Sequence, residues 1–214
     1  MTILTTKHLK QKIRPSLEKA HILPLVHYVK AKYYRLLGNN RLIRVPLDHL
    51  RCQEKPFSEL QGFSGKPIAD FPPCQFLQLS LTDPKKALDA FEQWLRKCLI
   101  DYKAFQVPTA EGGWANSVLV RDILRAHQEQ SIILKDFEHA NPILIDAVIS
   151  RHAKQYFSVF NSIKENGYNK LLYPPIYCFP RGDHYVIENG HHRVSSLWVL
   201  GHEQAYVMVM RDEP

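Results

Sequence analysis

The sequence predicts an α/β (α+β) fold, a small mixed sheet with helices, and three observations lead to it. Residues 176–187 hold two short apolar runs joined by a Pro-Arg-Gly-Asp turn, which is typical of two neighbouring strands. A glycine then precedes a segment with helical spacing, and residues 205–210 return to a strand pattern. Upstream, residues 83–99 and 141–167 repeat apolar side chains at helical spacing, so two long helices are expected there.

Residues 1–40 are predicted to form a basic helical N-terminal arm, mostly helix over residues 7–38 with two proline interruptions. Residues 1–51 hold eleven Lys/Arg against two Asp/Glu, whereas the rest of the chain holds seventeen against nineteen. Basic residues interleaved with aromatic ones can bind anionic lipid headgroups or nucleic acid. An anionic membrane surface or non-specific nucleic acid is therefore one expected partner of residues 7–44, and a solvated helix face is the alternative.

The remainder, residues 41–214, is predicted to form one domain with a helical insertion at about residues 55–135. Residues 41–51 indicate a strand that runs into a proline turn. Residues 55–82 are rich in Pro, Phe, Gly and Ser and are expected to be irregular. An insertion at this place can shape a pocket for a substrate or a partner.

Helix ends are marked by residues whose local chemistry suits them. Residues 83–84 and residues 141–142 pair an N-cap Asp or Asn with a proline in the first turn. Asn116 is expected to cap a further helix. Gly167 ends the helix that precedes the sheet, and Gly201 stands where a left-handed cap ends the last helix.

The candidate site is the corner at which Asn189 and Gly190 lead into His191, His192 and Arg193. The first turn of a helix presents unpaired backbone N–H groups and the positive end of the dipole, both of which favour an anion. Arg193 adds a planar fork suited to phosphate, and either histidine can donate a hydrogen bond to it. A plain strand-to-helix corner with an exposed arginine is the alternative.

The Gly-His-His-Arg box, the Pro-Pro-Ile start of the preceding strand and the helix ending at Leu200-Gly201 resemble the ParB/sulfiredoxin superfamily. The resemblance covers about the last forty residues. Members of this superfamily carry Gly-x-x-Arg at the corner and hold nucleotide phosphates there. The resemblance therefore implies a ParB/sulfiredoxin-like fold that binds ATP or ADP, with Mg²⁺ arriving on the phosphates.

Two further roles are implied by the same resemblance. In sulfiredoxin-like members an arginine at the end of the first strand segment lies near the nucleotide, and Arg51 would be its counterpart. In the free-serine kinases of the superfamily a glutamate shortly afterwards acts as the base, and Glu54 would take that position. An ordinary exposed arginine and glutamate are the alternative.

The chain also departs from the family pattern. Sulfiredoxins need a cysteine where this chain has His191, and Cys178 is expected to be a small buried side chain, so sulfinic-acid reduction is not expected. Asn189 replaces the acid often found before the glycine, with Glu188 one position earlier. ParB proteins add a helix-turn-helix module, but this chain ends at Pro214, so sequence-specific DNA binding is not expected. No protein-only metal site is predicted.

These observations predict a nucleotide- or phosphate-binding ParB-like protein that acts as an ATP- or ADP-dependent kinase of a small metabolite. Glu54 and His192 are the expected catalytic residues. The alternative is a non-catalytic regulatory or binding module that senses a nucleotide or phosphosugar. The four widely separated cysteines and the lack of a signal segment favour the cytoplasm, with a peripheral membrane location as the alternative.

Overall fold

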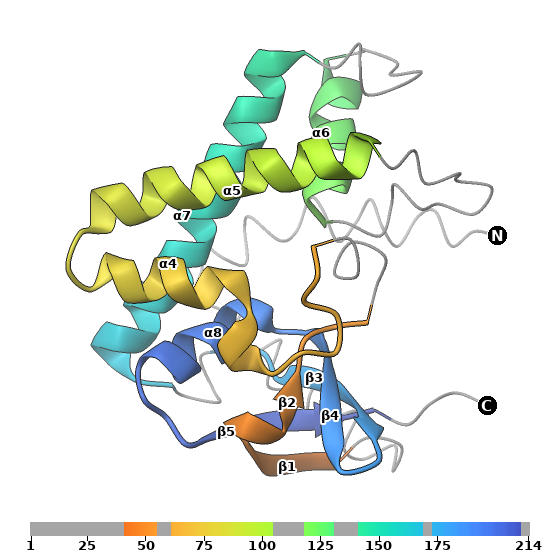
Figure 1. Cartoon of the computed structure of the whole chain (residues 1–214), viewed down its shortest axis with the longest axis vertical. Helices are drawn as coiled ribbons and strands as arrows, with labels where there is room; N and C mark the ends of the chain where they lie inside the picture. Colours follow the sequence, from red (N-terminus) through yellow and green to blue (C-terminus); the bar gives the residue numbers. More distant parts are fainter. Residues whose placement is uncertain (1–40, 55–60, 105–117, 131–140, 169–172, 211–214) are drawn as a thin grey trace, which may run out of the picture.

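The computed structural model describes residues 41–54, 61–104, 118–130, 141–168 and 173–210 (Figure 1). Within these residues the chain forms a five-stranded mixed sheet and five α-helices, which confirms the predicted α/β class. The predicted basic arm and its expected partners concern residues that lie outside this part, apart from the first residues of the first strand.

The sheet has the strand order β1-β5-β3-β4-β2. β3 and β4 form an antiparallel hairpin, β5 runs parallel to β3, and β1 runs antiparallel to β5. The expected strand-turn-strand and final strand are thereby confirmed. The strands are β1 (Arg41–Pro46), β2 (Leu50–Arg51), β3 (Ile176–Arg181), β4 (His184–Asn189) and β5 (Gln204–Val209).

The segment from β1 to β2 supplies both edges of the sheet. β1 ends at Pro46, a short 3₁₀ helix η1 (Leu47–His49) follows, and β2 then pairs with β4 at the other edge. Leu47 N donates to Glu203 O at 2.9 Å and holds this crossing in place. Because β2 and β4 are parallel, their carboxyl ends lie at the same end of the sheet.

The helices lie on one side of the sheet in Figure 1, with α8 and α4 nearest to it and α5 farther away. The predicted caps of α5 and α7 are confirmed, because Asp83 accepts from Lys86 N and Asn141 from Ile143 N, each at 3.0 Å. The predicted cap Asn116 lies outside the described residues. The helices are α4 (Pro72–Ser80), α5 (Pro84–Ala104), α6 (Val118–Glu129), α7 (Pro142–Asn166) and α8 (His191–Val199).

The prediction that residues 55–82 are irregular is wrong for the part that the structure describes. This part contains η2 (Ile68–Asp70) and α4. The two prolines at the start of α4 suit a first turn, where backbone N–H groups have no partner inside the helix. The side chains of Cys74 and Leu77 are buried. Packing therefore stabilises α4, although the composition of this segment does not predict a helix.

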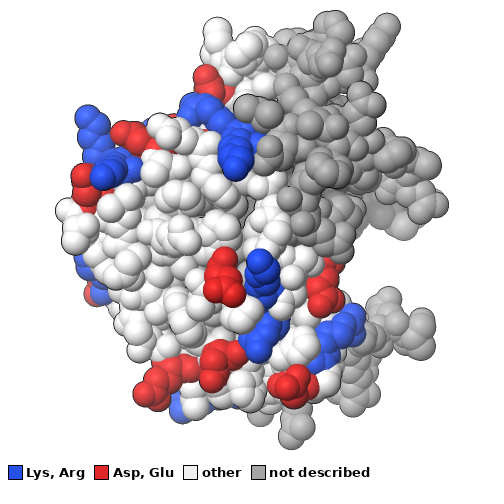
Figure 2. Space-filling model, viewed as in Figure 1, with Lys and Arg blue, Asp and Glu red and all other residues white. Residues whose placement is uncertain are grey.

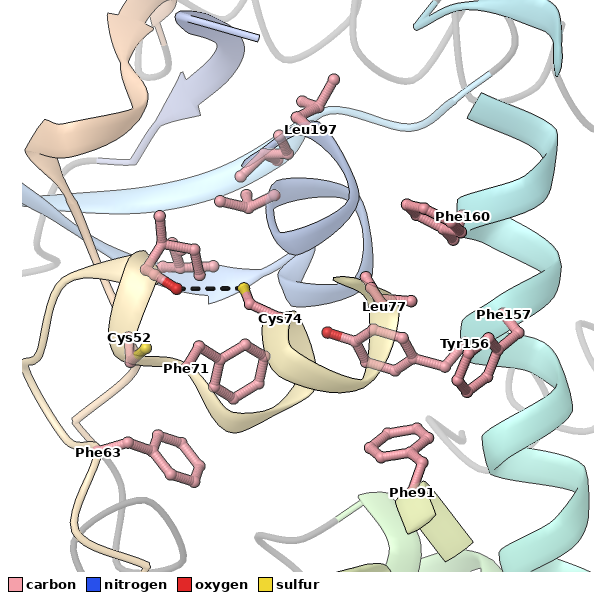
Figure 3. Close-up of a cluster of buried hydrophobic side chains, with 14 of the residues drawn as sticks. Cys52, Phe63, Phe71, Cys74, Leu77, Phe91, Tyr156, Phe157, Phe160 and Leu197 are labelled. Carbon is pink, nitrogen blue, oxygen red and sulfur yellow. Dashed lines mark hydrogen bonds between the residues drawn. The ribbon is translucent and has the colours of Figure 1, made fainter. Parts of the chain in front are cut away.

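The hydrophobic core fills the space between the sheet and the helices, and aromatic side chains occupy much of it (Figure 3). The ring of Phe91 lies 5.0 Å from the ring of Tyr156, edge to face. Cys74 Sγ donates to Ile68 O at 3.3 Å and links α4 to η2.

In the residues that can be described, no helix is both long and apolar enough to cross a membrane.

Candidate functional site

The glycine corner, residues 189–193, joins β4 to α8. Gly190 has a φ of +116°, and a Cβ atom at this position would lie 3.0 Å from Ile176 Cγ1 and 3.0 Å from Arg193 Nη2. Both the backbone conformation and the close packing therefore require glycine. The N–H groups of Arg193 and Val194 make the first hydrogen bonds of the helix, to Gly190 O at 2.9 and 3.0 Å. The positive end of the α8 dipole is at this corner.

Arg193 points into the protein. Its side chain is 8% exposed, and its guanidinium donates to the carbonyl groups of Pro174 and Pro175, the latter at 3.0 Å, and to Asn189 Oδ1 at 3.4 Å. Burial lowers the pKa of this guanidinium. The sequence predicts that Arg193 holds phosphate, but its donors here serve carbonyl groups and tie α8 to the start of β3. Direct contact with a phosphate stays a prediction and would require exchange of these bonds.

The loop after β2 lies beside the glycine corner. Gln53 N donates to His191 Nε2 at 3.3 Å, and the ring of Phe71 lies 5.4 Å from that of His191. The next residue, Glu54, is exposed, and a Cβ atom built at Gly65 would lie 3.4 Å from its Oε1. The structure thus brings the segment that carries Glu54 to the start of α8. Glu54 faces solvent, whereas Arg193 faces the interior.

Arg51 lies toward the opposite end of β4. Its guanidinium donates to the carbonyl groups of Asp48 and Leu50, the latter at 3.2 Å. It is also one of the charges that lower the pKa of Asp183 in the β3–β4 turn, after the larger effect of the hydrogen bond with His184. The Arg51 guanidinium thus serves carbonyl groups of its own segment, and its contact with a nucleotide, which the resemblance implies, stays a prediction.

His192 is half-buried against α7. Its ring centroid lies 4.0 Å from that of Tyr156, whose hydroxyl group is 2.5 Å from Ser195 Oγ. Burial lowers the pKa of His192 to about 4, and the charges of Arg193 and His152 add to the effect. His192 is therefore neutral at pH 7, so it would meet a phosphate as a neutral imidazole and not as a cation.

A second polar pair lies near this corner and was missed by sequence reasoning. His152 Nε2 is 2.8 Å from Asp122 Oδ2, and this contact joins α7 to α6. The two residues stand 30 positions apart. The spacing of His152 and Tyr156, four residues apart on one helix, was the one local signal that could have drawn attention to His152.

The thiols are inaccessible. Cys52, Cys74, Cys98 and Cys178 are all buried, and the burial expected of Cys178 is confirmed. Burial raises the pKa of Cys52, Cys74 and Cys178 to about 12, so these groups are protonated at neutral pH.

The histidines of β4 and the glycine corner do not come together. His184 bonds to Asp183 at 3.0 Å at the far end of β4. Among the residues that the structure describes, no three His, Cys, Asp or Glu side chains are arranged to hold a metal ion.

The described surface in Figure 2 carries Lys and Arg side chains beside Asp and Glu side chains, with neither sign gathered into one patch. Arg44, at the end of the segment expected to bind anionic surfaces, donates to Tyr206 Oη at 2.8 and 2.5 Å. Its guanidinium also lies 4.9 Å from the centre of that ring.

No model of a known protein family, no curated protein sequence and no solved structure matches this chain. The resemblance to the ParB/sulfiredoxin superfamily therefore stays a prediction, and the candidate site stands on its own geometry.

Proposed function

We propose that the glycine corner binds the phosphate of a nucleotide or another phosphorylated small molecule, in a domain of the ParB/sulfiredoxin type. The arrangement of β2 and β4 carries this proposal, because both strands run in parallel toward the start of α8. Ligands of α/β proteins commonly bind at the carboxyl ends of strands, and phosphates at helix N-termini. The hydrogen bond from Gln53 N to His191 Nε2 supports a site formed by both segments.

The roles of the corner residues differ from those of a simple arginine clamp. The backbone of His191 and His192 would approach the phosphate, while Arg193 and Asn189 keep the corner in its shape. ATP or ADP would bring Mg²⁺, which keeps several waters and binds mainly to phosphate oxygens.

In the enzyme form of this proposal, a phosphate passes from the nucleotide to a hydroxyl group of a small metabolite. The exposed Glu54 carboxylate would accept the proton of that hydroxyl group as its oxygen attacks phosphorus. The bond from phosphorus to the leaving nucleotide oxygen breaks in the same step. Glu54 directly follows Gln53, whose backbone N–H contacts His191.

Calorimetric titration with inorganic phosphate, ADP and ATP, each with and without Mg²⁺, tests binding. We expect His191→Ala to weaken binding about tenfold, because it removes the side chain that holds the loop of Gln53 beside the corner. The matched control is His202→Ala, at the exposed far end of α8, which is expected to bind as the wild type does. The proposal fails if none of the three ligands binds, or if both variants bind equally well.

A non-catalytic binding module is the second candidate, and the inward-facing Arg193 favours it. An arginine that serves carbonyl groups is less able to stabilise charge on a phosphate in transfer. Phosphorus NMR of the nucleotide with a panel of hydroxylated metabolites separates the two. If the protein is a kinase, the nucleotide signal decreases when the right metabolite is present. Glu54→Gln should stop this decrease, and the control Glu203→Gln should still show it. Binding without turnover supports the module.

A further inference from the structure

The face of the sheet that is turned away from the helices is also apolar. The described helices lie on one side of the sheet (Figure 1), and strand residues such as Ile187 and Val207 belong to the core on that side. Side chains alternate along a strand, and residues that pair across two strands share a face. The other side, here called the second face, therefore carries Leu42, Phe179, Val186, Tyr206 and Met208. A sheet with two apolar faces needs a layer on each of them.

Part of the second face is closed to water. Met208 is 0% exposed and Val186 is 6% exposed, although neither joins the cluster of buried side chains between the sheet and the helices. Leu42, Phe179 and Tyr206 beside them are half-buried. A sheet face that meets water carries mostly polar side chains, whereas these five are apolar or aromatic. Burial and composition both indicate a covered face.

The sequence just before β1 contains an apolar stripe. Residues 25–37 lie outside the described part, and they follow the second proline of the predicted helical arm without a further interruption. At the helical spacing of about 100° per residue, an arc of about 120° gathers Leu25, Val26, Val29, Tyr33, Leu36 and Leu37. The basic residues Lys30, Lys32 and Arg35 fall outside this arc, and Ala31 falls opposite Val29. The pattern predicts an amphipathic helix.

The link between this stripe and the sheet is short. Residues 38–40 separate it from Arg41, where β1 begins at an edge of the sheet. Connections of about two to six residues normally join a helix to the strand on which it packs. A helix over residues 25–37 would be about 20 Å long, close to the length of about 20 Å of a six-residue strand. Because α4 and α8 already lie on the first face, the second face is the one left to this segment.

We infer that residues 25–37 dock on the second face of the sheet as an amphipathic helix, with the apolar stripe against Phe179, Val186 and Met208. The domain then has three layers, with the sheet between this helix and the described ones. The basic side chains of the segment point outward in this arrangement. An anionic membrane or nucleic acid would therefore meet the segment through charge alone, because the sheet occupies the stripe that would otherwise enter a bilayer.

Cross-linking of the full chain tests this arrangement. The four native cysteines are buried, so cysteines introduced by substitution are the ones that react. A short bismaleimide should join Val29→Cys to Phe179→Cys within one chain. The matched control combines Phe179→Cys with Ala31→Cys, on the opposite side of the predicted helix, and should give about tenfold less product. Val29→Cys combined with Gln93→Cys, at an exposed position of α5, should give none.

Three cross-linking results overturn the inference: no product, equal product from Val29→Cys and Ala31→Cys, or product that joins two chains, which would assign the second face to a second copy. Labelling covers the case in which the chain with Phe179→Cys does not fold. In the otherwise native chain a maleimide should modify Val29→Cys about tenfold more slowly than Ala31→Cys, and equal rates overturn the inference. Protection of Val29→Cys that requires phosphatidylserine vesicles would assign the stripe to a membrane and overturn it as well.

Discussion

Both ends of α8 are formed by glycines with positive φ, yet the two ends differ in their surroundings. At the C-terminal end a Cβ atom on Gly201, with a φ of +76°, would meet nothing within 4 Å. At the N-terminal end a Cβ atom on Gly190 would meet Ile176 and Arg193 at 3.0 Å. The C-terminal end is thus determined by local backbone conformation alone. The N-terminal end also depends on contacts with β3 and α7, and the candidate site lies there.

The C-terminal end follows a known capping pattern. His202 N donates to Leu197 O at 3.0 Å and Gly201 N to Trp198 O at 3.1 Å, which is a Schellman motif. This confirms the left-handed cap that the sequence predicts. At the N-terminal end, by contrast, polar groups far apart in the chain must meet. Four substitutions or conditions test whether the stability of α8 is concentrated at that end.

The largest expected effect is that of Arg193→Met. This change leaves the half-buried carbonyl groups of Pro174 and Pro175 without their donor and should lower the free energy of unfolding by about 3–4 kcal/mol. Urea denaturation followed by circular dichroism measures it. The control Arg181→Met changes an exposed arginine in β3 and should cost less than about 1 kcal/mol. Equal losses in the two variants would mean that the Arg193 contacts contribute no more than an exposed side chain does.

The glycine pair tests the comparison directly. Gly190→Ala should lower the free energy of unfolding by about 3 kcal/mol, since the left-handed conformation costs 1–2 kcal/mol and the contacts with Ile176 and Arg193 add about as much. Gly201→Ala should cost about 1 kcal/mol, because only its backbone conformation is unfavourable. Thermal or urea unfolding measures both. If the order is reversed, the packing at the N-terminal end is looser than the distances indicate.

Acid should weaken the N-terminal end through His192. The folded state keeps its pKa at about 4, against a usual value near 6.5, so the unfolded state binds the proton more readily. The stability from the neutral ring is present above about pH 6.5 and is lost as the pH falls toward 4, with a change of about 3 kcal/mol. Urea midpoints of wild type and His192→Gln between pH 7 and 4 measure the difference, and His202→Gln is the control. If the His192→Gln variant loses as much stability as the wild type over this pH range, groups other than His192 cause the loss.

The smallest effect concerns the hydroxyl group that joins α7 to α8. Tyr156→Phe removes the buried contact with Ser195 Oγ at 2.5 Å and should cost about 1 kcal/mol. Ser195 Oγ keeps its bond to His191 O at 2.7 Å, which limits the loss. The control is Tyr173→Phe, whose half-buried hydroxyl group bonds to Ser162 at 2.6 Å. If Tyr173→Phe lowers the free energy of unfolding more than Tyr156→Phe does, the contact between Tyr173 and Ser162 contributes more stability than the contact between α7 and α8.

Local chemistry explains which elements could be predicted. Asn141 and Pro142 mark the start of α7 because a side-chain acceptor and a missing N–H group suit a first helical turn wherever they occur. The hairpin of β3 and β4 follows from its alternating pattern and turn. α4 was not predicted, because two prolines and a short apolar pattern resemble a loop until the helix packs against its neighbours.

The candidate site shows the same division. Gly190 and the start of α8 could be predicted, since a strand, a glycine and a helical pattern follow one another in the chain. The loop of Gln53 and the pair Asp122–His152 could not, because loops and helices far apart in the sequence come together only on folding. The sequence also did not predict that the Arg193 side chain points into the protein, because its carbonyl acceptors lie far away in the sequence.

The sequence by itself indicated where α8 begins and ends, because a glycine that allows positive φ stands at each end. Only the tertiary structure decided the partners of Arg193, Glu54 and His192. A guanidinium binds the acceptors that folding brings within its reach, and here these are the half-buried carbonyl groups before β3. Burial depends on the whole packed arrangement, so the local sequence does not contain it.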